Sequence, residues 1–176
     1  MITTYKIVKE QPGKLIERLK VFQNEYIPLG EEDRKVYYLA KRDIYNNSSL
    51  PEVEIAALFI FLNRTCFNGL YRVNKNNFFN VPIGSYKKPT ICDAENILAV
   101  NESLKKVEIL TGDYQQTLDF AERPALFYFD PPYKPLSKTS SFNSYSKDDF
   151  NDDEQIRLRD FCKKLDSLNH YWILSN

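Results

Sequence analysis

The chain has 176 residues, of which 43% are hydrophobic and 27% charged, a composition typical of one globular domain. Its 24 basic and 24 acidic residues leave no net charge, so the overall charge indicates no particular class of partner. No apolar run approaches the roughly 20 residues that a membrane span needs, which excludes a helical membrane protein. Three well-separated cysteines and a single histidine predict reduced thiols, a cytoplasmic location and no metal site.

The first half of the chain predicts four helices. Residues 3–9 have the pattern of the end of a helix, and Pro12 suits the first turn of the next one. Residues 31–45 carry apolar side chains at helical spacing, and a more apolar helix follows Pro51. The aromatic and aliphatic stripes of these helices indicate core packing.

The second half alternates short apolar runs with a helix. Three runs are predicted strands, namely 107–110, 125–129 and 171–174. A helix near 152–165 separates the last two, and Asn151 followed by Glu154 resembles a capping box at its start. This alternation predicts parallel strands in an α/β sheet. Active sites of such sheets lie beyond the carboxyl ends of the strands, so the residues after positions 110 and 129 are candidate site residues.

The tetrapeptide Asp130-Pro131-Pro132-Tyr133 follows the second of these runs. Consecutive prolines remove two N–H donors and stiffen the backbone. The turn therefore presents only acceptors, the Asp130 carboxylate and the Pro131 carbonyl, beside the Tyr133 ring. Two acceptors and a ring suit the amino group of a planar base, because hydrogen bonds from both amine hydrogens localise the nitrogen lone pair for attack on an electrophilic methyl group. A plain surface turn is the alternative interpretation.

Two longer segments are more specific than the tetrapeptide alone. One is F-D-P-P-Y at 129–133, followed by P-L-S at 135–137 and F-x-x-Y at 142–145. The other is N-R-T-C-F-N-G-L-Y-R-V-N at 63–74, followed by F-N-V-P-I-G at 79–84 and Y-K-K-P at 86–89. In this order they resemble the Dam-type (D12 class) DNA adenine-N6 methyltransferases, and the resemblance extends through nearly the whole chain.

The resemblance implies an α/β fold, a partial Rossmann-like S-adenosylmethionine-dependent methyltransferase sheet with a mainly helical target-recognition insert. Residues 1–90 would form the helical region and the DNA target-recognition stretch, and residues 91–176 part of the catalytic domain. The implied reaction transfers a methyl group from S-adenosylmethionine to N6 of an adenine flipped out of duplex DNA, with GATC as the expected site. The implied catalytic residues are Asp130, Pro131, Pro132 and Tyr133.

Residues 63–90 support the DNA interpretation independently. They hold five lysines and arginines, no acidic residue, six asparagines and interleaved aromatic side chains. Lys and Arg can neutralise phosphates, Asn and Arg can read base edges, and an aromatic ring can fill the space that a flipped base leaves. A solvated basic loop with some aromatic residues in the core is the alternative.

The resemblance also assigns individual DNA contacts within this stretch. It makes Phe67 the candidate ring for insertion into the duplex. Asn68, Arg72 and Asn74 are candidates for contacts that set sequence choice. Lys75 is the candidate for a phosphate contact that is the same on every sequence.

The turn Gly112-Asp113-Tyr114 follows the first predicted strand. By resemblance it faces the adenine ring of the cofactor. Asp113 would accept from the amino group of that ring and Tyr114 would lie beside it, with Asp130 as a third cofactor residue. A helix start capped by Asp113 is an alternative and compatible interpretation.

The cofactor loop of the family, F-x-G-x-G, has no counterpart here, because none of the five glycines lies two residues from another. We therefore expect an internal piece of a methyltransferase, which does not methylate DNA alone and whose unpaired strand edges invite self-association. Competing hypotheses are a cytosine-N4 DNA methyltransferase, which uses similar acceptors, and a non-catalytic DNA-binding remnant. A metal nuclease is a third, since an acidic cluster lies at 148–154, but its position at a helix start favours capping and dipole compensation.

Overall fold

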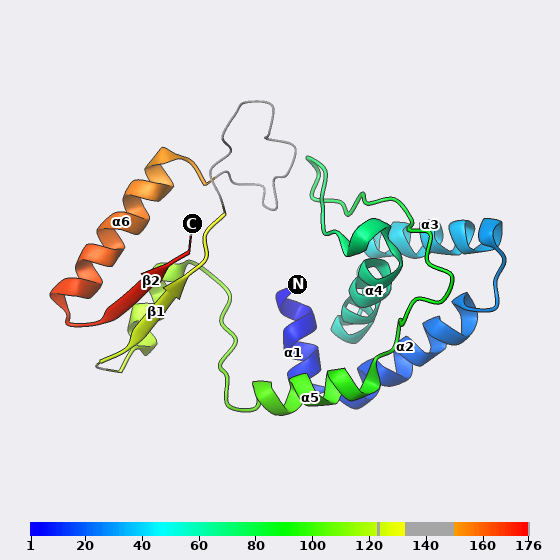
Figure 1. Ribbon diagram of the computed structural model, residues 1–176, viewed down its shortest axis with the longest axis horizontal. Helices are drawn as coiled ribbons and strands as arrows, with labels where there is room; N and C mark the ends of the chain where they lie inside the picture. The colour runs from blue at the N-terminus through cyan, green and yellow to red at the C-terminus, as the bar shows by residue number, and fades with distance from the viewer. Residues whose placement is uncertain (123, 133–149, 176) are drawn as a thin grey trace. The chain divides into compact units, whose positions relative to one another are not determined.

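The computed structural model describes residues 1–122, 124–132 and 150–175. The chain divides into two compact units, Met1–Leu110 and Thr111–Asn176, which are coloured blue to green and green to red in Figure 1. Together they form a helix-rich chain with a small two-stranded parallel sheet. The functional division expected at residue 90 stays a prediction, because compactness of the backbone does not test it.

The first unit is a helical assembly built around one apolar helix. Its helices are α1 (Ile2–Glu10), α2 (Pro12–Tyr26), α3 (Glu31–Asn47), α4 (Glu52–Thr65), the short η1 (Phe67–Gly69) and α5 (Ala94–Leu104). Helix α4 packs against α1, α2 and α3, and its position among them can be followed in Figure 1. Its Leu58, Phe61 and Leu62 are fully buried, as expected for a helix that is apolar on most sides.

The four helices expected in the first half are confirmed. Pro12 occupies the first turn of α2, where its missing N–H costs no hydrogen bond. Helix α5 was not expected, although the sequence carries its start signal. Asp93 accepts a hydrogen bond from the backbone N–H of Asn96 at 3.2 Å, which is N-cap geometry, and Ile97 then faces the core.

The second unit is built on the expected strand–helix–strand pattern. Its elements are η2 (Tyr114–Phe120), β1 (Leu126–Phe129), α6 (Asp152–Ser167) and β2 (Tyr171–Leu174). The two strands are parallel, with Leu126 opposite Tyr171 and Phe129 opposite Leu174. Asn151 caps α6 by accepting from the N–H of Glu154 at 3.0 Å, so the predicted helix start is confirmed.

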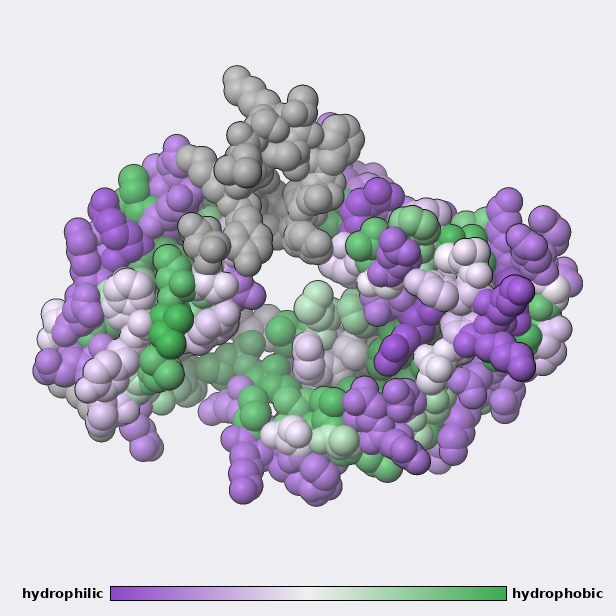
Figure 2. Space-filling view, viewed as in Figure 1, coloured by the Kyte–Doolittle hydropathy of each residue, from purple (hydrophilic) through white to green (hydrophobic). Residues whose placement is uncertain are grey.

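Helix α6 covers one face of the small sheet. Its buried Phe161 lies edge-on to Phe127 and Phe129, with ring centroids 6.2 and 6.0 Å away. Exposure alternates along β1, where Leu126 and Tyr128 are exposed, whereas all four residues of β2 are exposed. Figure 2 shows apolar side chains open beside the hydrophilic outer side of α6.

One expected strand is absent. Residues 107–110 have no strand conformation, so the prediction of a strand there was wrong. Apolar residues form a strand only where a partner pairs their backbone groups, and in the part of the chain that the structure describes the only ladder joins β1 and β2. The N–H of Val107 instead closes a turn onto the carbonyl of Leu104 at 3.0 Å.

The described residues were compared with the requirements of a membrane-spanning helix and of a metal site. Within 1–122, 124–132 and 150–175, no helix is long and apolar enough to cross a bilayer. The same residues contain no group of His, Cys, Asp and Glu side chains that could hold a metal ion.

Candidate functional site

Residues 72–80 form a short antiparallel hairpin, here called the recognition hairpin. The N–H of Asn74 donates to the carbonyl of Phe78 at 2.9 Å, and the N–H of Asn80 donates to that of Arg72 at 3.1 Å. Between these bonds Val73 pairs with Phe79. The basic stretch is therefore an ordered projection from the helical unit, and its side chains have defined positions along two strands.

The tip of the hairpin is held by Asn74. Its Oδ1 accepts from the N–H groups of Asn76 and Phe78 at 2.9 and 3.0 Å, as Asn side chains commonly do in turns. Asn77 adopts a positive φ of 62°, which Asn tolerates better than most residues. Asn74 thus has a structural role in the turn, while the exposed Lys75 lies at the tip. Reading of a base by Asn74 stays a prediction.

Arg72 is fixed by the opposite strand of the hairpin. Its Nε donates to Asn80 Oδ1 at 2.8 Å and its Nη2 to the Asn80 carbonyl at 3.2 Å. A guanidinium has five N–H donors, so these two bonds orient the group and leave the donors of Nη1 for another acceptor. The side chain is exposed, and its contact with a base stays a prediction.

Phe67 and Asn68 lie in a tight turn directly after α4. Asn68 and Gly69 have φ values of 52° and 61°, and the N–H of Leu70 donates to the carbonyl of Phe67 at 3.2 Å. Two successive positive φ values define a type I′ turn, for which Asn-Gly is the favoured pair. The ring of Phe67 is 51% exposed, so this turn presents it to solvent.

The segment after the hairpin pairs with the end of α4. Phe67 donates its N–H to the carbonyl of Pro82 at 2.9 Å, and Gly84 donates to that of Thr65 at 2.8 Å. Only glycine fits at position 84, because a Cβ there would lie 2.8 Å from the carbonyl oxygen of Cys66. Burial raises the pKa of the Cys66 thiol, which keeps it protonated and inert.

The predicted catalytic turn follows β1 in the second unit. The N–H of Ser175 donates to the carbonyl of Phe129 at 2.8 Å, so the ladder holds the chain up to the residue before Asp130. Asp130 is exposed, and among the described residues it has no hydrogen bond or ion pair. Asp130 thus lies at the carboxyl end of a parallel strand, and its use as an acceptor stays a prediction. Tyr133 lies outside the described residues.

Asp113, a predicted cofactor residue, is the N-cap of η2. Its Oδ1 accepts from the N–H of Gln115 at 2.9 Å, and its Oδ2 accepts from Nη1 of Arg157 at 2.6 Å. The first of these bonds, followed by the second, lowers the pKa of the carboxyl group. The capping interpretation is confirmed, and it is compatible with a further acceptor role because each carboxylate oxygen has a second lone pair.

Tyr114 packs into the second unit rather than lying free on its surface. Its ring is edge-on to Phe129 and Phe161, at 6.2 and 5.5 Å between centroids, and the Arg157 guanidinium lies 4.8 Å from its centre. Arg157 also pairs with Glu154 at 2.8 Å, and its pKa is raised by its bonds to Glu154 and Asp113. Tyr114 thus links the predicted cofactor turn to the strand that carries Asp130.

A sequence profile of the D12 class N6 adenine-specific DNA methyltransferases matches residues 1–176. The chain belongs to this family. It is 49% identical to the Type II methyltransferase M.MjaIII of Methanocaldococcus jannaschii, over all of this chain and 62% of that protein. It is 41% identical to the Type II methyltransferase M1.LlaDCHI of Lactococcus lactis subsp. cremoris and 31% identical to the DNA adenine methylase of Escherichia coli K12, in each case over all of this chain and 61% of the relative. The chain therefore spans about three fifths of the length of these relatives.

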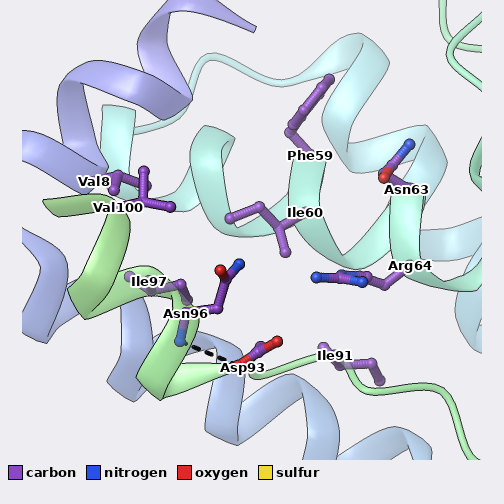
Figure 3. A pocket seen from close by; sticks show the side chains of 10 residues that line it. All are labelled: Val8, Phe59, Ile60, Asn63, Arg64, Ile91, Asp93, Asn96, Ile97 and Val100. Carbon is purple, nitrogen blue, oxygen red and sulfur yellow. Dashed lines mark hydrogen bonds between the residues drawn. The ribbon is translucent and has the colours of Figure 1, made fainter. Parts of the chain in front are cut away.

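A cavity of about 220 Å³ lies in the helical unit, apart from the residues predicted to contact DNA or cofactor. Figure 3 shows it between α1, α4 and α5, with an apolar wall and a polar rim formed by Asn63, Arg64, Asp93 and Asn96. Its polar groups have local partners in part, since Asn63 Nδ2 donates to the Gly69 carbonyl at 2.6 Å. This bond braces the turn that presents Phe67.

Sequence reasoning missed Arg157, which contacts two predicted cofactor residues. It stands 44 positions from Asp113 in the chain, and nothing in the local pattern of α6 distinguishes it from the neighbouring Arg159. The only signal in the sequence was its position near the start of the predicted helix. That position does not identify a partner.

Proposed function

We propose that this chain carries the target-recognition and catalytic parts of a methyltransferase that transfers a methyl group from S-adenosylmethionine to N6 of adenine in duplex DNA. The observation that carries the proposal is Asp130, an exposed carboxylate without a partner among the described residues, at the carboxyl end of β1 in a chain of the D12 class. The parallel β1–α6–β2 unit is compatible with a partial Rossmann-like sheet.

The chemistry assigned to the turn follows from its acceptors. The Asp130 carboxylate and the Pro131 carbonyl would accept the two hydrogens of the adenine amine and draw its lone pair toward tetrahedral geometry. Pro131 and Pro132 fix this geometry because each has a locked φ, so little motion is lost when the base binds. Stacking of the base on Tyr133 completes the proposal.

The cofactor fits the second unit at its adenine end. S-adenosylmethionine, when bound, supplies a methyl group on a positively charged sulfur. Asp113 retains lone pairs for an amino group, although both of its oxygens already accept one hydrogen bond. Tyr114 is packed between aromatic rings, which favours a role as the support of this turn.

The DNA side of the proposal rests on the first unit. The exposed Phe67 ring would fill the space left by a flipped adenine, and Asn68 lies in the same turn. Arg72 would read a base edge with its remaining donors, and Lys75 at the hairpin tip would contact a phosphate. GATC is the proposed recognition site, from resemblance of this stretch to that of the Dam-type enzymes.

A chimera tests the function without depending on where this chain begins or ends. The chain replaces the matching 178-residue segment of the M.MjaIII methyltransferase, and the purified chimera is incubated with tritiated S-adenosylmethionine and duplex DNA with or without GATC. We expect label at N6 of adenine in GATC, and label lower by roughly a hundredfold or more from the Asp130→Ala chimera.

The other outcomes separate the competing hypotheses. Label at N4 of cytosine would identify the cytosine enzyme. A chimera that folds and binds DNA but shows no cofactor affinity by titration would identify the non-catalytic remnant. Adenine label outside GATC would retain the reaction and replace the proposed site.

A further inference from the structure

Helix α3 carries four polar side chains at intervals of four residues. They lie on the side that faces the end of the recognition hairpin and the segment after it. They are Arg34, Tyr38, Arg42 and Asn46, here called the α3 ladder. Each of them donates a hydrogen bond to a backbone carbonyl between residues 79 and 87. A repeat of four keeps side chains on one face of a helix.

Asn46 bonds to both backbone groups of one residue, Phe79. Asn46 Nδ2 donates to the carbonyl of Phe79 at 3.0 Å, and Asn46 Oδ1 accepts from the N–H of Phe79 at 2.9 Å. The side-chain amide therefore occupies the place that a neighbouring strand would take. Phe79 is only 3% exposed, so both of its backbone groups need a protein partner.

The other members extend this contact along the same segment. Buried Tyr38 donates its hydroxyl to the carbonyl of Val81 at 2.8 Å, and Arg42 donates to the same carbonyl at 3.2 Å. Arg34 donates to the carbonyl of Lys87 at 2.8 Å. The segment itself forms only single bridges, one at Phe79 and one four residues later, so the helix supplies much of its pairing.

The ladder fixes the strand on which Arg72 depends. Phe79 pairs with Val73, and the next residue, Asn80, accepts the Arg72 guanidinium through both its side chain and its carbonyl. A displacement of Phe79 along α3 therefore displaces Asn80 and reorients Arg72. Asn46 is hydrogen-bonded to Phe79, and the next residue in the chain, Asn80, is hydrogen-bonded to Arg72.

We propose that Asn46 is a positioning residue for DNA sequence discrimination, which holds the recognition hairpin in the register that aims Arg72. This inference rests on the proposed function, because it assigns Asn46 to the same recognition event. Asn46 itself contacts the backbone of Phe79, and it acts on the DNA only through the hairpin.

The test compares Asn46→Ala with Asn47→Ala in the full chain. Asn47 is the adjacent residue of α3, and among the described residues its Nδ2 donates only to Asp43, at 2.8 Å, so its removal controls for the loss of a helical asparagine. Competition binding gives the affinity for a GATC duplex and for a scrambled duplex. We expect Asn46→Ala to reduce the ratio of the two affinities on the order of tenfold, the size of one lost base contact. Its affinity for the scrambled duplex should not change. Asn47→Ala should leave both affinities at their wild-type values.

Asn46→Asp guards against a variant that fails to fold. It keeps the acceptor for the Phe79 N–H and loses the donor, so we expect an intermediate ratio. Its added charge lowers the affinity for both duplexes alike and cancels in the ratio. A folded Asn46→Ala or Asn46→Asp protein with the wild-type ratio would overturn the proposal.

Amide hydrogen exchange separates this proposal from the proposed function. If the wild-type chain binds DNA without preferring GATC, the proposed recognition site is wrong, and the exchange of the Asn74 and Asn80 amides then decides the role of Asn46. Faster exchange at both amides in Asn46→Ala, and not in Asn47→Ala, supports the positioning role. Unchanged exchange refutes it.

Discussion

The predicted recognition segment (residues 63–90) and the described part of the predicted catalytic turn (residues 130–132 of 130–133) are held in different ways. The recognition segment is bonded to itself and to α3, and its predicted reader Arg72 is already fixed by two hydrogen bonds. The catalytic turn is held by a strand ladder that stops one residue before Asp130, and the carboxylate is left without a partner among the described residues. The predicted recognition residues are therefore held by many contacts along the segment, whereas the predicted catalytic carboxylate is held only through the end of one strand.

This difference predicts that Asp130 can be changed without a structural penalty. We expect Asp130→Ala in the chimera to lower single-turnover methyl transfer by roughly a hundredfold or more, the size of one lost transition-state hydrogen bond. Its unfolding midpoint should stay near that of the parent, because Asp130 is exposed and has no partner among the residues that the structure describes. Asp130→Asn keeps one acceptor oxygen and should retain more activity than Ala. Near-normal turnover of Asp130→Ala would contradict the assigned role.

Substitutions in the hairpin should separate the reading of bases from the binding of phosphates. We expect Arg72→Ala to cost about 1–3 kcal/mol of discrimination between cognate and scrambled duplexes, with a smaller loss of general affinity. Lys75→Ala should weaken binding to both duplexes equally and reduce the salt dependence by about one phosphate contact. Competition binding at several salt concentrations measures both effects. Equal losses on the two duplexes for Arg72→Ala would exclude base reading.

A substitution at His170 should weaken the frame behind the catalytic turn. His170 is 5% exposed, and its Nδ1 accepts from the N–H of Ala125 at 3.2 Å, just before β1 begins. We expect His170→Ala to lower the free energy of unfolding by about 1–3 kcal/mol, because the half-buried N–H of Ala125 is left without its acceptor. Thermal unfolding of the full chain measures this loss. Asn101→Ala is a comparison in the first unit, where it removes the two hydrogen bonds that the buried Asn101 donates to the carbonyls of Val8 and Lys9.

The elements that the sequence predicted well are those with local signals. Proline at a helix start, an Asn cap and short apolar runs placed α2, α6, β1 and β2 correctly. The strand at 107–110 was wrong because extended backbone needs a partner that the run itself does not specify. Helix α5 was missed although the sequence has at Asp93 a residue type that is favoured as an N-cap.

The site residues divide in the same way. The motif placed Asp130 at a strand end, because the apolar run before it and the prolines after it are local signals. The Asn68-Gly69 turn that exposes Phe67 was not predicted, although Asn-Gly is a favoured pair for such a turn. The long-range contacts that support the predicted site residues could not be found this way. Asn46 lies 33 positions from Phe79, and Arg157 lies 44 positions from Asp113. Such pairings arise from packing of helices onto distant segments, for which the sequence carries no spacing rule.

The smallest expected effect concerns Asp113, which shows how the second unit holds its predicted cofactor turn. The pKa of Asp113 is lowered mainly by the N–H of Gln115 and secondarily by Arg157. A carboxyl group whose pKa is lowered by folding stabilises the folded state at pH values above its ordinary pKa. This stabilisation is lost as the pH falls through the lowered pKa.

Arg157→Ala should therefore raise the Asp113 pKa part of the way to its ordinary value, so that acid weakens the turn at a higher pH. Carboxyl NMR titration measures the shift, with Arg159→Ala as control, because Arg159 is 56% exposed and pairs with Asp160 instead. An Asp113 pKa that is equal in Arg157→Ala and the parent would mean that the backbone N–H alone sets the charge of this turn.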